Sequence, residues 1–151
     1  MKLGSLFDGS GGFPLAGAMF GIEPVWASEI EPFPIKVTTA RFPGMKHLGD
    51  VTKINGAEIE PVDIITFGSP CQDLSVGGHR KGVINGERSS LFFEAVRIIK
   101  EMREHDRSIG RTDINIRPRY IVWENVCGAM SSNAGFDFLT AEHQHVGNFL
   151  H

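Results

Sequence analysis

Cysteine is scarce in this chain of 151 residues: only Cys71 and Cys127 are present, too few for a disulfide framework. Long hydrophobic runs are missing too, since no stretch reaches the length of a membrane-spanning helix, about 18 apolar residues. The N-terminus enters a strand-like segment at once, with no visible signal peptide. These absences predict a protein of the reducing cytoplasm that has no part in a membrane.

The chain also lacks an excess of positive charge. Its 15 Lys and Arg against 18 Asp and Glu give a formal net charge of −3, which argues against a protein dedicated to binding nucleic acid. Residues 80–119 depart from this balance, with ten basic and six acidic side chains. A basic stretch can attract phosphates. For residues 97–107 we favour instead a solvated helix face on which Glu and Arg form pairs.

What is present is the composition of a globular domain with a core, 41% hydrophobic and 22% charged. Strand-like and helical segments alternate, which predicts an α/β fold with a doubly wound, mostly parallel sheet. The loop at 68–88 is longer than structural connections usually are, so we expect it to be functional. The expected strands are 2–7, 23–28, 47–51, 62–67 and 119–124, and the expected helices are 13–20, 33–41 and 90–102.

A glycine-rich turn follows the first expected strand, with the sequence Asp-Gly-Ser-Gly-Gly at 8–12. Glycines let the backbone approach a ligand and lead into the next helix. About 20 residues further on, Glu29 ends the second strand, where an acid typically binds a ribose. Glu31 competes for this role, and we favour Glu29 because it adjoins the strand. The turn departs from G-x-G-x-x-G, which argues mildly against a pyrophosphate, and a tight turn without a ligand remains an alternative.

Asp50 follows the third expected strand. Its carboxylate could accept a hydrogen bond from an adenine amino group. It could equally cap a helical turn at 51–54, and the two roles are compatible.

Cys71 follows a strongly apolar strand and the sequence Gly-Ser-Pro at 68–70. Glu124 ends the strand expected beside it, so both residues should reach one edge of the sheet. A thiolate that adds to a ring carbon, and a carboxyl that hydrogen-bonds a ring nitrogen, suit covalent catalysis on an electrophilic ring. The alternatives are an inert loop cysteine and a glutamate that merely precedes a helix.

Taken together, these segments resemble the N-terminal catalytic part of the C5-cytosine-specific DNA methyltransferase family (Dcm-type). The resemblance implies a Rossmann-like, S-adenosylmethionine-dependent methyltransferase fold with strand order 3-2-1-4-5. It covers a partial catalytic domain at 1–133, followed by an irregular tail at 134–151, with no target-recognition domain. The matching motifs are LFDGSGGF at 6–13, SE at 28–29, GDV at 49–51, GSPCQDLS at 68–75, RSSLF at 88–92 and ENV at 124–126.

The resemblance also implies roles for individual residues. Cys71 would attack C6 of a cytosine flipped out of double-stranded DNA, and Glu124 would hold its N3 edge. A methyl group would pass from S-adenosylmethionine to C5, and no metal is expected. Residues at the cofactor would be Phe7, Gly9, Gly12, Glu29, Asp50, Val51, Pro70 and Leu91. Residues at the DNA would be Gln72, Ser75, Arg80 and Lys81.

Several features depart from the family pattern. Cys127 stands where the family usually has proline, and Asp8 where it usually has a small residue, with a side chain expected to point away from the cofactor. A Gln-x-Arg-x-Arg segment is missing, which predicts a truncated chain that needs a complementing chain or is an inactive remnant. An RNA cytosine-5 methyltransferase is a further alternative. A thiol redox or nicotinamide-binding protein explains the motifs poorly.

Overall fold

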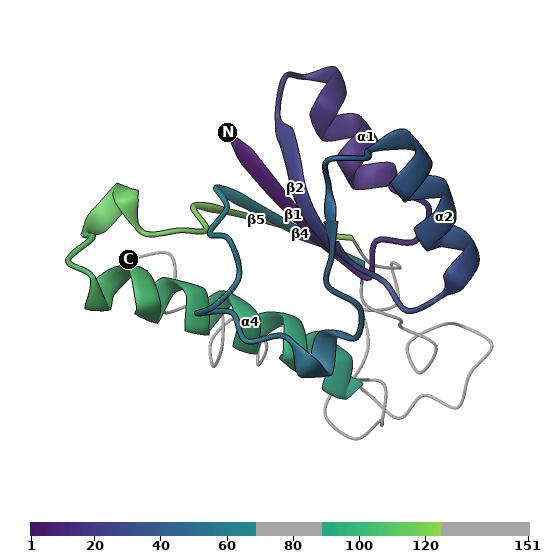
Figure 1. Cartoon of the computed structure of the whole chain (residues 1–151). Helices are drawn as coiled ribbons and strands as arrows, with labels where there is room; N and C mark the ends of the chain where they lie inside the picture. Colours follow the sequence, from purple (N-terminus) through teal and green to yellow (C-terminus); the bar gives the residue numbers. More distant parts are fainter. Residues whose placement is uncertain (69–88, 125–151) are drawn as a thin grey trace, which may run out of the picture. The chain divides into compact units, whose positions relative to one another are not determined.

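The computed structural model describes residues 1–68 and 89–124, and it shows an α/β fold built on one parallel sheet (Figure 1). The five strands have the order β3-β2-β1-β4-β5, as predicted, and every pair is parallel. The strands are β1 (Lys2–Leu6), β2 (Glu23–Ser28), β3 (Lys46–His47), β4 (Ile64–Phe67) and β5 (Tyr120–Trp123). The helices are α1 (Gly12–Met19), α2 (Pro32–Arg41) and α4 (Ser89–Ser108), with single 3-10 turns η1 (Val51–Lys53) and η2 (Asp113–Asn115).

The chain divides into two compact units. The first consists of Met1–Gly68 and Arg97–Glu124, and it contains all five strands. The second consists of Ser69–Val96 and Asn125–His151, of which the structure describes only the beginning of α4. In that part, the rings of Phe92 and Phe93 meet edge to face, with centroids 5.5 Å apart.

The core of the first unit lies around β1 and β4, the two central strands. All four residues of β4 and four of the five residues of β1 are buried. Central strands of a parallel sheet are covered on both faces, which explains the nearly continuous apolar sequence of β4. Their register places Leu3 opposite Ile64 and Leu6 opposite Phe67.

Helices cover both faces of this sheet, as a doubly wound fold requires. In the first unit, α1 and α2 lie on one side and the Arg97–Ser108 part of α4 lies on the other (Figure 1). That part of α4 buries Ile98, Ile99 and Met102, a stripe at helical spacing. The predicted doubly wound topology is therefore confirmed.

Two predicted elements have different lengths in the structure. The third strand, expected at 47–51, is only Lys46–His47. Gly49 has a φ of 71°, in the left-handed region, so the chain turns before Asp50 and cannot continue the strand. The helix expected to end near Met102 continues to Ser108. Within the described part of the chain, no helix is long and apolar enough to cross a membrane.

Candidate functional site

The turn after β1 has a backbone that side-chain-bearing residues rarely adopt. Gly9 and Gly11 have φ values of 57° and 83°, and Phe7 has a φ of 54°. A Cβ at Gly11 would lie 2.8 Å from Cγ2 of Thr38, so this position requires glycine for space as well as conformation. The sequence predicted the need for glycine. It did not predict the left-handed backbone of Phe7, which is uncommon outside functional sites.

Glu29 is hydrogen-bonded to this turn, although it lies 20 residues after Gly9 in the sequence. Its Oε2 accepts a hydrogen bond from the backbone N–H of Gly9 at 2.8 Å. Its Oε1 accepts from the N–H groups of Ile30 at 2.7 Å and Glu31 at 2.9 Å. A carboxylate offers about four acceptor positions, so one remains on Oε2 for a ligand. Glu31 contributes its N–H to this carboxylate, and the choice of Glu29 over Glu31 stays a prediction.

Ser28 links the Glu29 region to Asp50, a connection that the sequence did not reveal. Its buried hydroxyl donates to the carbonyl of Gly49 at 2.6 Å. Beside it, the N–H of Leu48 donates to the carbonyl of Ala27 at 2.8 Å. The two acids predicted to bind the cofactor therefore follow segments that are bonded directly to each other.

Asp50 caps η1, as one of its two predicted roles requires. Its Oδ1 accepts from the N–H of Thr52 at 3.0 Å and from the Thr52 hydroxyl at 2.8 Å. These bonds, with Lys53 nearby, hold the pKa of Asp50 below its ordinary value. Its Oδ2 lies 3.9 Å from Nζ of Lys53 and accepts no hydrogen bond within residues 1–68 and 89–124. One oxygen is thus used by the cap and the other is available to a ligand.

Asp8, in the same turn, has a buried carboxylate that the sequence did not predict. It is 6% exposed, and neither carboxylate oxygen has a hydrogen-bond partner among residues 1–68 and 89–124. Burial raises the pKa of Asp8 to about 6; the nearby Ser5 hydroxyl opposes this rise and the charge of Glu29 adds to it. The sequence marked Asp8 as unusual at this position but gave no sign of its burial.

Glu124 lies where the chain leaves β4 toward Cys71. The paired strands end with Phe67 opposite Trp123, whose rings are stacked with centroids 6.3 Å apart. The N–H of Glu124 then donates to the carbonyl of Phe67 at 3.0 Å. A Cβ at Gly68 would lie 2.9 Å from Oε2 of Glu124. The exposed carboxylate therefore lies beside the residue three positions before Cys71.

The structure brings together those predicted residues that belong to the first unit. They follow the carboxyl ends of the parallel strands, where ligands bind in such sheets. Leu91 belongs to the second unit, so its place relative to them is not described. The residues brought to this edge are Phe7, Gly9, Gly12, Glu29, Asp50, Val51 and Glu124. Pro70, Cys71, Gln72, Ser75, Arg80 and Lys81 lie outside the described residues.

The family model described as C-5 cytosine-specific DNA methylase matches residues 1–145 of the chain. The domain boundary expected at residue 133 lies inside this match and stays a prediction. In the described ranges, 1–68 and 89–124, no group of three His, Cys, Asp or Glu side chains could hold a metal ion.

The chain is also similar to named methyltransferases, and it shares its fold with a solved one. The chain is 34% identical to the Type II methyltransferase M.HhaI of Haemophilus parahaemolyticus, over 86% of this chain and 35% of that protein. It is 36% identical to a DNA N-6-adenine-methyltransferase of Escherichia phage P1, over 85% of this chain but only 17% of that protein. The Dnmt2 methyltransferase of S. pombe has the same fold, with a TM-score of 0.64, 21% identity, and coverage of 95% and 42% of the two chains. The chain therefore spans less than half the length of each of these proteins.

Proposed function

The chain belongs to the family of C-5 cytosine-specific DNA methylases, and from that premise we propose that it is the N-terminal, cofactor-binding and catalytic part of a DNA (cytosine-5)-methyltransferase. One observation carries this proposal: the strand ends bring Gly9, Glu29 and Asp50 into one hydrogen-bonded edge that also holds Glu124. Because the chain spans 17% to 42% of the relatives compared above, the activity would require further methyltransferase parts. A complementing chain is one source of them. We infer that the protein acts in the cytoplasm.

The cofactor end fits an adenine nucleoside. Glu29 has an acceptor position left on Oε2 for a ribose hydroxyl, and Oδ2 of Asp50 can accept from an adenine amino group. Around Gly9, a Cβ would meet no atom of the described residues within 4 Å, which leaves room beside the turn in that part of the chain. When bound, S-adenosylmethionine supplies an electrophilic methyl group. Phe7, Gly12, Val51, Pro70 and Leu91 would border it.

The catalytic end would act on a flipped cytosine. The Cys71 thiolate forms a bond to C6, while the Glu124 carboxyl hydrogen-bonds N3 and the exocyclic amine. The addition would make C5 nucleophilic, so C5 would accept the methyl group that bound S-adenosylmethionine supplies, and S-adenosylhomocysteine would leave. A base then removes the C5 proton, and the thiolate leaves as the ring double bond re-forms. Gln72, Ser75, Arg80 and Lys81 would contact the double-stranded DNA.

The two cysteines of the chain provide a matched test of the chemistry. The 151-residue chain, mixed with a separately produced C-terminal part of M.HhaI and S-adenosylmethionine, is incubated with duplex DNA containing 5-fluorocytosine. Fluorine at C5 cannot leave as a proton does, so the thiol adduct persists and intact-mass spectrometry detects it. The adduct is expected with Cys127→Ser and absent with Cys71→Ser. An adduct on neither protein, or on both, contradicts the proposed role of Cys71. Fluorinated RNA run in parallel tests the substrate class.

A further inference from the structure

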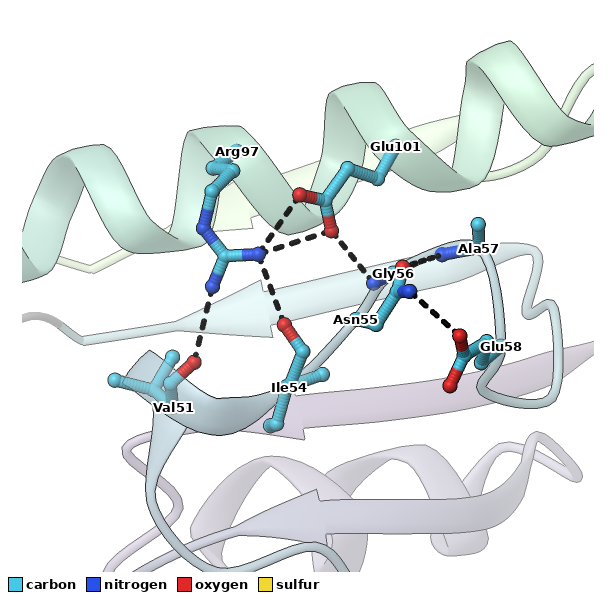
Figure 2. A network of polar contacts seen from close by, with 8 residues as sticks. All are labelled: Val51, Ile54, Asn55, Gly56, Ala57, Glu58, Arg97 and Glu101. Carbon is cyan, nitrogen blue, oxygen red and sulfur yellow. Dashed lines mark hydrogen bonds and ion pairs between the residues drawn. The ribbon is translucent and has the colours of Figure 1, made fainter.

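Arg97 and Glu101 of α4 bind the backbone of a segment more than 40 residues earlier in the chain, residues 51–56 (Figure 2). Nη1 of Arg97 donates to the carbonyl of Ile54 at 2.8 Å, and Nη2 donates to the carbonyl of Val51 at 3.3 Å. The same Nη1 lies 2.9 Å from both oxygens of Glu101. The Glu and Arg pairing expected on this helix is therefore present. Its side chains also hydrogen-bond the backbone of the 51–56 segment.

Glu101 completes the connection from the other side. Its Oε2 accepts from the N–H of Gly56 at 2.7 Å. A Cβ at Gly56 would lie only 2.2 Å from the carbonyl oxygen of Ile98, so the 51–56 segment touches the backbone of α4. The Arg97 and Glu101 side chains are 33% and 30% exposed, which makes this a partly buried network rather than a surface pair.

The 51–56 segment begins immediately after Asp50. On the preceding side, the Ser28 hydroxyl holds the carbonyl of Gly49 at 2.6 Å. On the following side, Arg97 holds the carbonyls of Val51 and Ile54, both of which are buried residues. The backbone that carries Asp50 is thus fixed by β2 before it and by α4 after it.

We propose that Arg97 and Glu101 are positioning residues of the cofactor site: by fixing the 51–56 segment, they set where Oδ2 of Asp50 meets the purine. This inference rests on the proposed function, because it assumes that Asp50 accepts from an adenine amino group. Its consequence is that the site should select between purines that differ at the position Asp50 contacts. A carboxylate held in place should distinguish a purine with an amino group from one with a carbonyl oxygen at the same position, and a loosened carboxylate should do so less.

The test compares S-adenosylhomocysteine with S-inosylhomocysteine, in which the purine amino group is replaced by oxygen. Isothermal titration calorimetry on the full chain gives the ratio of the two Kd values. For the wild type we expect a preference for adenine of about tenfold or more. In Arg97→Met and Glu101→Gln that preference should fall at least threefold, because adenosyl binding weakens more than inosyl binding. Arg97→Lys should restore part of it.

Arg107→Met is the matched control, since Arg107 is an exposed arginine of the same helix. It should keep the wild-type ratio. A merely structural role for Arg97 would weaken both ligands equally and leave the ratio unchanged, which would overturn the inference. Glu101→Gln, which is isosteric, provides the answer if Arg97→Met does not fold. If the wild type binds neither ligand, the proposed function itself fails; if it binds both without preference, only the role of Asp50 and the inference built on it fail.

Discussion

The two ends of the site are built in different ways. At the cofactor end, which comprises the 7–12 turn, Glu29 and Asp50, the carboxylates accept hydrogen bonds from the backbone and from Thr52. At the catalytic end, which comprises Gly68 and Glu124, the Glu124 carboxylate has no hydrogen bond or ion pair within residues 1–68 and 89–124. The strand that immediately precedes it, β5, is the last in the strand order of the described residues.

This difference indicates which end is preorganised. Side chains that are already held lose little freedom when a ligand binds, so the cofactor end should bind its ligand without rearrangement. Within residues 1–68 and 89–124, Glu124 is aligned through its backbone bond to Phe67 at the end of β5, a strand whose Tyr120 and Val122 are 54% and 45% exposed. The Glu124 carboxylate, which we propose to be catalytic, should therefore remain adjustable, and its position should depend on how firmly β5 packs against the rest of the first unit.

The largest effect should come from substituting Asp106, whose carboxylate binds Arg117 in the segment that leads into β5. Its fully buried carboxylate accepts from Nε and Nη2 of Arg117, each at 2.9 Å, and from the Arg117 N–H at 2.8 Å. Burial opposes ionisation, but these bonds hold the pKa of Asp106 below its ordinary value. Asp106→Ala should cost about 4 kcal/mol in urea unfolding at pH 7, because it leaves Arg117 without its partner.

The exposed residue Glu104 of the same helix gives the control, Glu104→Ala, with little change expected. The cost of Asp106→Ala should shrink as the pH falls below about 4, since the carboxylate contributes stability only while ionised. Hydrogen exchange should rise more in β5 than in the 7–12 turn. Equal exchange in both would remove the distinction between the two ends.

Gly56→Ala should have the next largest effect and should act on the cofactor end. The new methyl group would meet the carbonyl oxygen of Ile98 at 2.2 Å and Cβ of Glu101 at 3.0 Å, so the 51–56 segment must move away from α4. We expect a loss of about 3 kcal/mol in urea unfolding. Gly44→Ala, where none of the described residues lies within 4 Å of the new methyl group, should change stability by less than about 0.5 kcal/mol. Equal losses would show that the close approach to α4 is not needed.

Asp8→Asn should stabilise the protein, in contrast to the other changes. The folded-state pKa of Asp8 is raised to about 6, so folding disfavours its ionised form. At pH 3 the variant and the wild type should be equally stable, because the carboxyl is protonated in both folded and unfolded chains. From about pH 4 upward, the unfolding free energy of the variant should exceed that of the wild type. At pH values above 6 the difference should reach about 2 kcal/mol, after allowance for solvent screening. Urea unfolding across this pH range measures the gain, and a constant difference would contradict the buried, unpaired carboxyl.

Ser28→Ala should have the smallest effect. It removes the hydroxyl that donates to the carbonyl of Gly49, at an expected cost of about 1 kcal/mol in unfolding free energy. Cofactor affinity should fall a few-fold with it, since the segment before Asp50 is loosened. Ser10→Ala, at an exposed position of the turn, should leave stability unchanged. Similar values for the two variants would mean that the link between β2 and Asp50 does not hold the cofactor end.

Much of the fold followed from local patterns in the sequence. The apolar run before Gly68, the alternation of strands and helices, and the glycines of the turn each act over a few residues, and β2 has the bounds that were predicted for it. The strand order that places β5 beside β4 also followed, whereas the meeting of Glu124 with Cys71 stays a prediction because Cys71 lies outside the described residues. These predictions succeeded where a single periodicity or strand order decides the outcome.

The remainder depends on contacts that no local pattern encodes. The i,i+4 spacing of Arg97 and Glu101 predicts a pair, but not that their partners are the carbonyls and N–H of the 51–56 segment. The left-handed backbone of Gly49, which shortens β3, and the burial of Asp8 depend on how separate segments pack. Such features become visible only when the chain is folded.

The preorganised cofactor end is tested most directly by calorimetric titration of the full chain with S-adenosylhomocysteine, comparing Glu29→Ala with Glu31→Ala. Both variants remove a carboxylate two residues apart, but only that of Glu29 is bonded to Gly9. Glu31→Ala should bind like the wild type, and Glu29→Ala should bind about a hundredfold more weakly. Equal binding by the two variants would contradict a cofactor site built on Glu29.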